Sequence, residues 1–106
     1  MSKSFDRLKN ALKRLPGTGV KSAERMALHL ALENRADAIE IAESITAALE
    51  RITPCPECFG LSENGQPCEI CSDASRISDC LCVVEKASDI SAIEKSGAWR
   101  GKYHVL

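Results

Sequence analysis

Four of the six cysteines form two Cys-x-x-Cys pairs, Cys55 with Cys58 and Cys68 with Cys71, separated by nine residues. Each pair can place two thiolates on one tetrahedral metal ion, and four protein thiolates leave no open coordination position. A redox dithiol requires only one such pair, and an iron–sulfur cluster that uses four thiolates usually has a different spacing. The pattern therefore predicts one zinc ion per chain, structural rather than catalytic, held by Cys55, Cys58, Cys68 and Cys71.

The composition of the chain changes around these cysteines. Residues 55–79 are rich in Cys, Pro, Gly, Ser and Asn and poor in apolar residues, which is typical of a loop-rich module that needs a metal to hold it. The sequence has no secretion signal and no apolar run long enough to cross a bilayer. We therefore expect a cytoplasmic protein without membrane contact, in which the thiols are reduced and free to bind metal.

Apolar residues at helical spacing predict three helices before the cysteine module, over residues 4–15, 21–34 and 37–52. Ser4 is the expected N-cap of the first helix. In the second helix, Leu28 and Leu32 lie off the main apolar stripe, so this helix is apolar on too many sides for a lone surface helix. We therefore expect two copies of the chain to form a homo-oligomer through these N-terminal helices.

Beyond the cysteine module the pattern becomes strand, helix, strand. Residues 81–84 are a short apolar run, residues 88–96 have helical spacing that ends at Gly97, and residues 103–106 form a second strand pattern. This order is the beginning of a βαβ unit. The expected fold is α+β and mostly helical, with a helical region over 1–53, a four-cysteine module over 54–79 and a strand–helix–strand segment over 80–106.

The formal net charge of −1 conceals a basic N-terminal end. Residues 1–25 contain seven Lys or Arg and two acidic residues, whereas residues 53–106 contain five Lys or Arg and eight acidic residues. Within the basic end, the turn from Pro16 to Gly19 separates the first two helices. Glycines allow a backbone to approach a phosphate closely, and the N–H groups at the start of the following helix point towards such an anion. The candidate phosphate contacts are Gly17, Gly19, Lys21 and Arg25.

A plain turn between two antiparallel helices would have the same sequence pattern, with Lys21 and Arg25 on a solvated face. A Walker-type loop and a dinucleotide fingerprint can be set aside, because a helix and not a strand precedes the glycines. The residues alone therefore leave two interpretations open, a phosphate-binding loop and a simple turn.

The hairpin resembles a known DNA-binding element. Leu15-Pro16-Gly17-Thr18-Gly19, followed by Lys21-Ser22-Ala23 and Arg25, is similar to the helix-hairpin-helix of the bacterial recombination mediator RecR family. Thr18 departs from the usual apolar residue, and Val20 stands where the family often has proline. Helix-hairpin-helix elements contact phosphates and not base edges, so the resemblance implies sequence-independent binding to the DNA backbone. The order of helix-hairpin-helix, four-cysteine finger and then a Val83-Val84-Glu85 strand is also the order in the RecR family, so the resemblance covers the whole chain.

The last part of the chain resembles the beginning of a Toprim domain. Leu81-Cys82-Val83-Val84-Glu85 is similar to its first strand, in which the glutamate works with a later Asp-x-Asp pair. The sequence contains no Asp-x-Asp and stops at Leu106, so we expect a truncated Toprim domain, a solvated Glu85 and no enzymatic activity. RecR family members use the missing parts of Toprim to engage RecO, so the resemblance also implies a RecO-like partner whose surface this chain largely lacks.

Together these observations predict a DNA-binding protein of recombinational DNA repair in the bacterial cytoplasm, associated with the nucleoid. It would comprise a helix-hairpin-helix region, a structural zinc finger and the start of a Toprim sheet. Two other classes remain open. In the first, the chain is a zinc-stabilised protein-interaction adaptor that does not itself bind DNA. In the second, Glu85 takes part in metal-dependent phosphoryl transfer, which the missing Asp-x-Asp disfavours.

Overall fold

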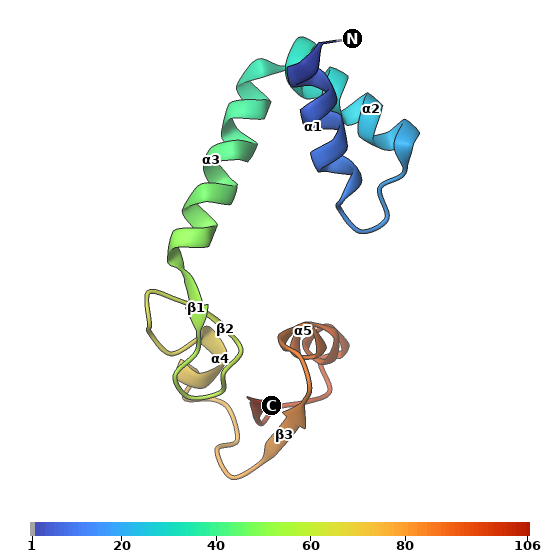
Figure 1. The fold of residues 1–106 in the computed structure, drawn as a ribbon. Coiled ribbons are helices and arrows are strands. Elements are labelled where there is room, and N and C mark those ends of the chain that lie inside the picture. Colours follow the sequence, from blue (N-terminus) through green and yellow to red (C-terminus); the bar gives the residue numbers. More distant parts are fainter. Residues whose placement is uncertain (1) are drawn as a thin grey trace. The chain divides into compact units, whose positions relative to one another are not determined.

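The computed structural model describes residues 2–106 and divides the chain into two compact units (Figure 1). The first unit ends at Ala47, and the second extends from Ala48 to Leu106. None of the helices in this described part of the chain combines the length and apolarity needed to cross a membrane. The N-terminal elements are α1 (Lys3–Lys13), α2 (Val20–Leu28), the π-helical turn η1 (His29–Glu33) and α3 (Arg35–Arg51), whose last turn enters the second unit.

The boundaries of these helices differ from those predicted. The N-cap of α1 is Ser2 and not Ser4, because the Ser2 Oγ accepts a hydrogen bond from the Phe5 N–H at 3.0 Å. The predicted second helix divides into α2 and η1, where the Asn34 N–H donates to the His29 carbonyl five residues back, at 2.8 Å. The Asn34 Oδ1 then accepts from the Asp37 N–H at 2.9 Å and caps α3, which starts earlier than predicted.

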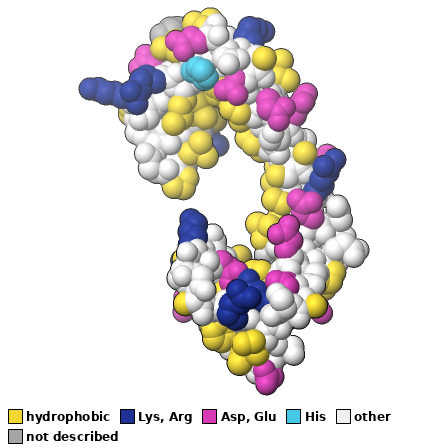
Figure 2. All heavy atoms as spheres, turned by 180° about the vertical axis from the view of Figure 1, so that it is seen from behind, with side chains coloured by type: hydrophobic (Ala, Val, Ile, Leu, Met, Phe, Trp, Pro, Cys, Tyr) yellow, Lys and Arg dark blue, Asp and Glu magenta, His cyan; other side chains and the backbone are white. Residues whose placement is uncertain are grey.

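The first unit buries very little apolar surface. α1 packs against α2, and Ala23 and Ala27 of α2 are fully buried. No large apolar side chain is buried between residues 2 and 47; Leu32, for example, is 74% exposed. Hydrophobic side chains consequently gather on the surface of the N-terminal helices (Figure 2). An exposed apolar surface of this kind is typical of an interface.

The second unit contains the cysteine module and the predicted βαβ segment. In the module, β1 pairs with β2 in antiparallel orientation, and in the following segment β3 pairs with β4 in parallel with α5 between them. This parallel pairing confirms the predicted βαβ order. The elements are β1 (Ile52–Pro54), β2 (Leu61–Glu63), α4 (Glu69–Ser72), β3 (Leu81–Val84), α5 (Ala87–Ser96) and β4 (Lys102–Val105).

One small core joins the two parts of the second unit. Val84, Ile90 and Tyr103 are buried in it, and Ile70 of the cysteine module packs against them. The module approaches α5 closely at Gly60, where an added Cβ would lie 3.1 Å from the Ile90 Cδ1. The metal module and the βαβ segment therefore stabilise each other through shared contacts.

Gly101 is the tightest glycine position in the second unit. A Cβ at this residue would lie 2.6 Å from the Cys80 carbonyl oxygen and 2.7 Å from the Trp99 ring. We expect Gly101→Ala to lower the free energy of unfolding by roughly 1–3 kcal/mol, because backbone must move to relieve the clash. Urea denaturation measures the change. Gly19→Ala is the control, since nothing lies within 4 Å of a Cβ there; equal stability of the two variants would contradict the prediction.

Candidate metal centre and nucleic-acid interface

The four cysteines of the two Cys-x-x-Cys pairs meet in one cluster. Cys55 follows β1, Cys58 lies in the turn before β2, Cys68 is the N-cap of α4 and Cys71 lies within α4. Their four sulfur atoms all lie within 4.8 Å of one another. The structure thus brings together all four residues that the spacing singled out.

The sulfur geometry fits a tetrahedral zinc ion. Zinc–sulfur bonds of about 2.3 Å place the sulfurs of a regular tetrahedron about 3.8 Å apart. The distances from Cys55 Sγ to Cys71 Sγ and from Cys58 Sγ to Cys68 Sγ are both 3.8 Å. Cys55 and Cys58 are buried, and four thiolates close the coordination sphere. The centre is therefore structural and offers no position for a substrate.

Backbone amides stabilise the thiolates of this cluster. The N–H groups of Gly60 and Cys68 donate to the sulfurs of Cys58 and Cys55, each at 3.3 Å. Burial raises the pKa of Cys55, but hydrogen bonds from backbone amides outweigh burial and lower this pKa to about 6. Burial raises the pKa values of Cys58 and Cys71. A metal ion must therefore displace protons from the latter thiols, so zinc affinity falls at low pH.

Residues distant in sequence hold the metal module against β4. The Lys102 Nζ donates to the carbonyl oxygens of Ile70 and Cys71 at 3.2 and 3.0 Å, at the end of α4. The Val105 N–H donates to the Cys58 carbonyl at 2.8 Å. Each contact joins a metal-binding knuckle to the last strand of the chain. These contacts could not be predicted from the sequence, because a lone lysine in a strand pattern does not indicate which residue it will bind.

An ion pair fixes the loop that follows the metal module. The Arg76 side chain donates to the Glu94 carboxylate of α5 at 3.0 Å, and the Tyr103 hydroxyl donates to the same carboxylate. The hydrogen bonds from Arg76 and Tyr103 lower the pKa of Glu94. Glu94 therefore remains ionised and is already satisfied by partners within the second unit.

The hairpin between α1 and α2 contains a tight turn. The Thr18 N–H donates to the Leu15 carbonyl at 3.1 Å, with Pro16 and Gly17 at the two central positions. Gly17 has φ +78°, which together with the proline indicates a type II turn. Gly19 then serves as the N-cap of α2 and contributes no side-chain cap. The first amide groups of α2 are therefore left without a side-chain partner from the cap.

Neither the backbone conformation nor the surroundings of Gly19 require a glycine at this position. Its φ of −87° is accessible to any residue, and an added Cβ would meet nothing within 4 Å. Lys21 and Arg25 follow one helical turn apart and are exposed, and neither forms an ion pair within residues 2–106. The first turn of α2 contains no acidic residue. The backbone at Gly19 is thus sterically accessible at the start of α2, close in sequence to the two cations Lys21 and Arg25.

Glu85 stands outside both of these sites. It is exposed directly after β3, as expected for a solvated strand end. Among the described residues, the four cysteines are the one group of three or more potential ligands close enough to share a metal ion.

Comparison with known proteins agrees with this arrangement. A family model for the RecR helix-hairpin-helix matches residues 5–49, and a model for the RecR zinc finger domain with four cysteine ligands matches residues 52–73. The chain belongs to the RecR family. The zinc finger match confirms the prediction of a zinc finger. The other match identifies the region that contains α1 and α2 as a helix-hairpin-helix, a fold that is consistent with interaction with DNA.

Curated relatives of the RecR family align with nearly the whole chain. Proteins named "Recombination protein RecR" are 50% identical over 90% of the chain in Desulfatibacillum aliphaticivorans and 48% identical over 99% in Acinetobacter baylyi. In Psychrobacter cryohalolentis the identity is 41% over 100% of the chain. These alignments cover 47%, 52% and 53% of the relatives, so the chain spans about half of their length.

Proposed function

We propose that this chain binds the phosphate backbone of DNA without reading base sequence and acts in recombinational DNA repair. The N–H groups of Gly17 and Gly19 would contact phosphate oxygens, with Lys21 and Arg25 as the fixed charges. The Thr18 N–H between them is already engaged by the Leu15 carbonyl. The open backbone at Gly19 is the observation that carries the proposal, because neither its φ nor its surroundings require glycine. A phosphate at the helix start would require the absence of a Cβ there.

A binding role, rather than catalysis, is also part of this proposal. In the part of the chain that the structure describes, Glu85 belongs to no group of three or more side chains close enough to share a metal ion, so we assign it no catalytic metal in this proposal. We place the protein in the bacterial cytoplasm, associated with the nucleoid through its DNA contacts. A RecO-like partner, suggested by the family, would engage mainly the parts of Toprim that this chain does not span.

A salt titration of DNA binding tests the proposal. Fluorescence anisotropy with a labelled oligonucleotide should give an affinity that falls steeply with salt, log K changing by roughly 0.7–0.9 per log unit of salt for each phosphate neutralised. A second oligonucleotide of scrambled sequence should bind equally well. Absence of binding at low salt would favour the adaptor interpretation, and a strong preference for one sequence would contradict backbone recognition.

Self-association through the N-terminal helices would strengthen this binding, because each hairpin supplies few contacts. On α3, the apolar residues Ile41, Ile45 and Leu49 lie on one face at helical spacing and are 41%, 57% and 80% exposed. We propose that a second copy of the chain covers this face. Such a contact would offset the near absence of buried apolar side chains in the first unit.

Leu49→Glu should weaken this self-association about tenfold or more, because burying a leucine contributes roughly 1.5–3 kcal/mol. Sedimentation velocity over a range of concentrations measures the change. Ile39→Glu is a matched control, because Ile39 is also exposed on α3, at 59%, but faces away from this stripe. A monomeric parent at high micromolar concentration, or equal effects of the two variants, would argue against the interface.

A further inference from the structure

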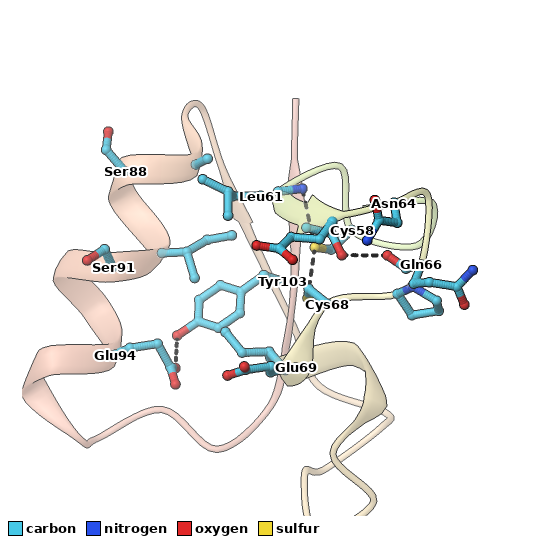
Figure 3. Close-up of a pocket in the computed structure, with 17 residues that line it drawn as sticks. Cys58, Leu61, Asn64, Gln66, Cys68, Glu69, Ser88, Ser91, Glu94 and Tyr103 are labelled. Atoms are coloured by element: carbon cyan, nitrogen blue, oxygen red, sulfur yellow. Dashed lines mark hydrogen bonds between the residues drawn. The ribbon is translucent and has the colours of Figure 1, made fainter. Parts of the chain in front are cut away.

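A groove lies between the cysteine module and α5, within the second unit (Figure 3). Its volume is about 870 Å³, which is at the upper end of the range for ligand sites in proteins. Leu61 and Ile70 from the module, Ile90 from α5 and Tyr103 from β4 form an apolar lining. Ser88 and Ser91 of α5 are also among the residues that line the groove, and both are exposed.

The rim of this groove is acidic. Glu63 and Glu69 line it and are exposed, whereas Glu94 is already paired with Arg76. No lysine or arginine is among the residues that line the groove in the described chain. Neither Glu63 nor Glu69 forms an ion pair within the described residues, so two unpaired carboxylates lie beside the apolar lining. A complementary ligand would combine positive charge with apolar side chains.

We propose that this groove binds a peptide segment of a partner protein in which lysine or arginine alternates with apolar residues. The apolar side chains would occupy the space between Leu61, Ile90 and Tyr103, and the cations would approach Glu63 and Glu69. This surface is separate from the hairpin that we propose for DNA binding, so the two activities can be tested independently. Cys58 and Cys68 form part of the groove wall, so the peptide site requires the zinc-bound form.

The test uses zinc-loaded protein and three fluorescein-labelled peptides of equal length. The first alternates lysine with leucine and valine, the second has serine in place of leucine and valine, and the third has glutamate in place of lysine. Only the first should bind measurably, because the site requires both charge and apolar contact. If the serine peptide binds as tightly as the first peptide, binding is nonspecific charge attraction and the proposal is wrong. Absence of binding by the first peptide at millimolar concentration would also overturn the proposal.

Protein variants locate the site. Ser91→Trp should fill the groove and weaken binding of the first peptide about tenfold or more, whereas Ala92→Trp on the same helix should change the affinity less than about twofold. Ala92 is exposed and does not line the groove. Neutralising both rim carboxylates with Glu63→Gln and Glu69→Gln should also weaken binding, and Glu43→Gln with Glu50→Gln on α3 is the matched control. Equal losses for variant and control in both pairs would overturn the proposal.

Backbone amide NMR distinguishes a peptide from a second copy of the chain. Addition of the first peptide should shift the signals of Leu61 and Ser91 and leave those of Gly19 and Lys21 unchanged. If the Leu61 and Ser91 signals instead shift with protein concentration in the absence of peptide, a second copy occupies the groove and the proposal is wrong. Elemental analysis and circular dichroism of each variant show whether zinc and fold are retained.

Discussion

Cys58→Ser should abolish zinc binding and unfold the second unit. Loss of one thiolate opens the coordination sphere, and structural zinc contributes about 10–16 kcal/mol to the folding of small finger peptides. The remaining core is small, with Val84, Ile90 and Tyr103 as its buried members. It cannot offset the ordering entropy of the loop-rich module. We expect the region from residue 54 to 79 to lose its structure first.

Unfolding should then spread to β4, because the Cys58 carbonyl accepts the hydrogen bond from Val105 and the end of α4 accepts those from Lys102. Elemental analysis and amide NMR of parent and variant measure these effects. Cys80→Ser is the matched control, since Cys80 is exposed and lies outside the cluster. A parent protein that contains iron, or a Cys58→Ser protein that retains one zinc per chain and dispersed NMR signals, would contradict this prediction.

Lys21→Glu should weaken binding to every DNA sequence alike, by about tenfold or more at low salt. The substitution removes one phosphate contact and adds a repulsive charge, so the slope of log K against log salt should fall by about one. The helix should tolerate it, because Lys21 lies in the first turn of α2, where an acidic side chain interacts favourably with the helix dipole. Anisotropy titrations at several salt concentrations measure the slope, and circular dichroism checks the fold.

Lys95→Glu on α5 is the matched control for charge, because it changes the net charge equally and lies far along the chain from the hairpin. Gly19→Ala tests the backbone contact separately: the fold should be retained, since the added Cβ meets nothing within 4 Å, yet DNA binding should weaken because the Cβ blocks the approach of a phosphate. If Lys21→Glu binds DNA as well as the parent at low salt, the hairpin is only a turn.

The metal centre could be predicted from the sequence because its determinants are local. Each Cys-x-x-Cys pair has a spacing that places two sulfurs on one ion. The two pairs supply all four ligands of the described cluster. The βαβ order was equally predictable from apolar runs and from Gly97, which ends α5 with φ +70°. The helix starts were predicted less accurately, because Ser2 and Ser4 are both acceptable caps and only the hydrogen bond to Phe5 distinguishes them.

The sequence by itself thus determined the zinc ligands, the α+β class and the candidate hairpin, since these depend on residues close together in the chain. Tertiary structure alone decided which distant residues support them. The Lys102 side chain donates a hydrogen bond to a carbonyl at the end of α4. Gly101 has no Cβ and therefore allows the Cys80 carbonyl to lie close to it. Residues of α5 form one side of the acidic groove. None of these has a periodicity or motif, because packing between segments far apart in sequence depends on complementary shape and charge.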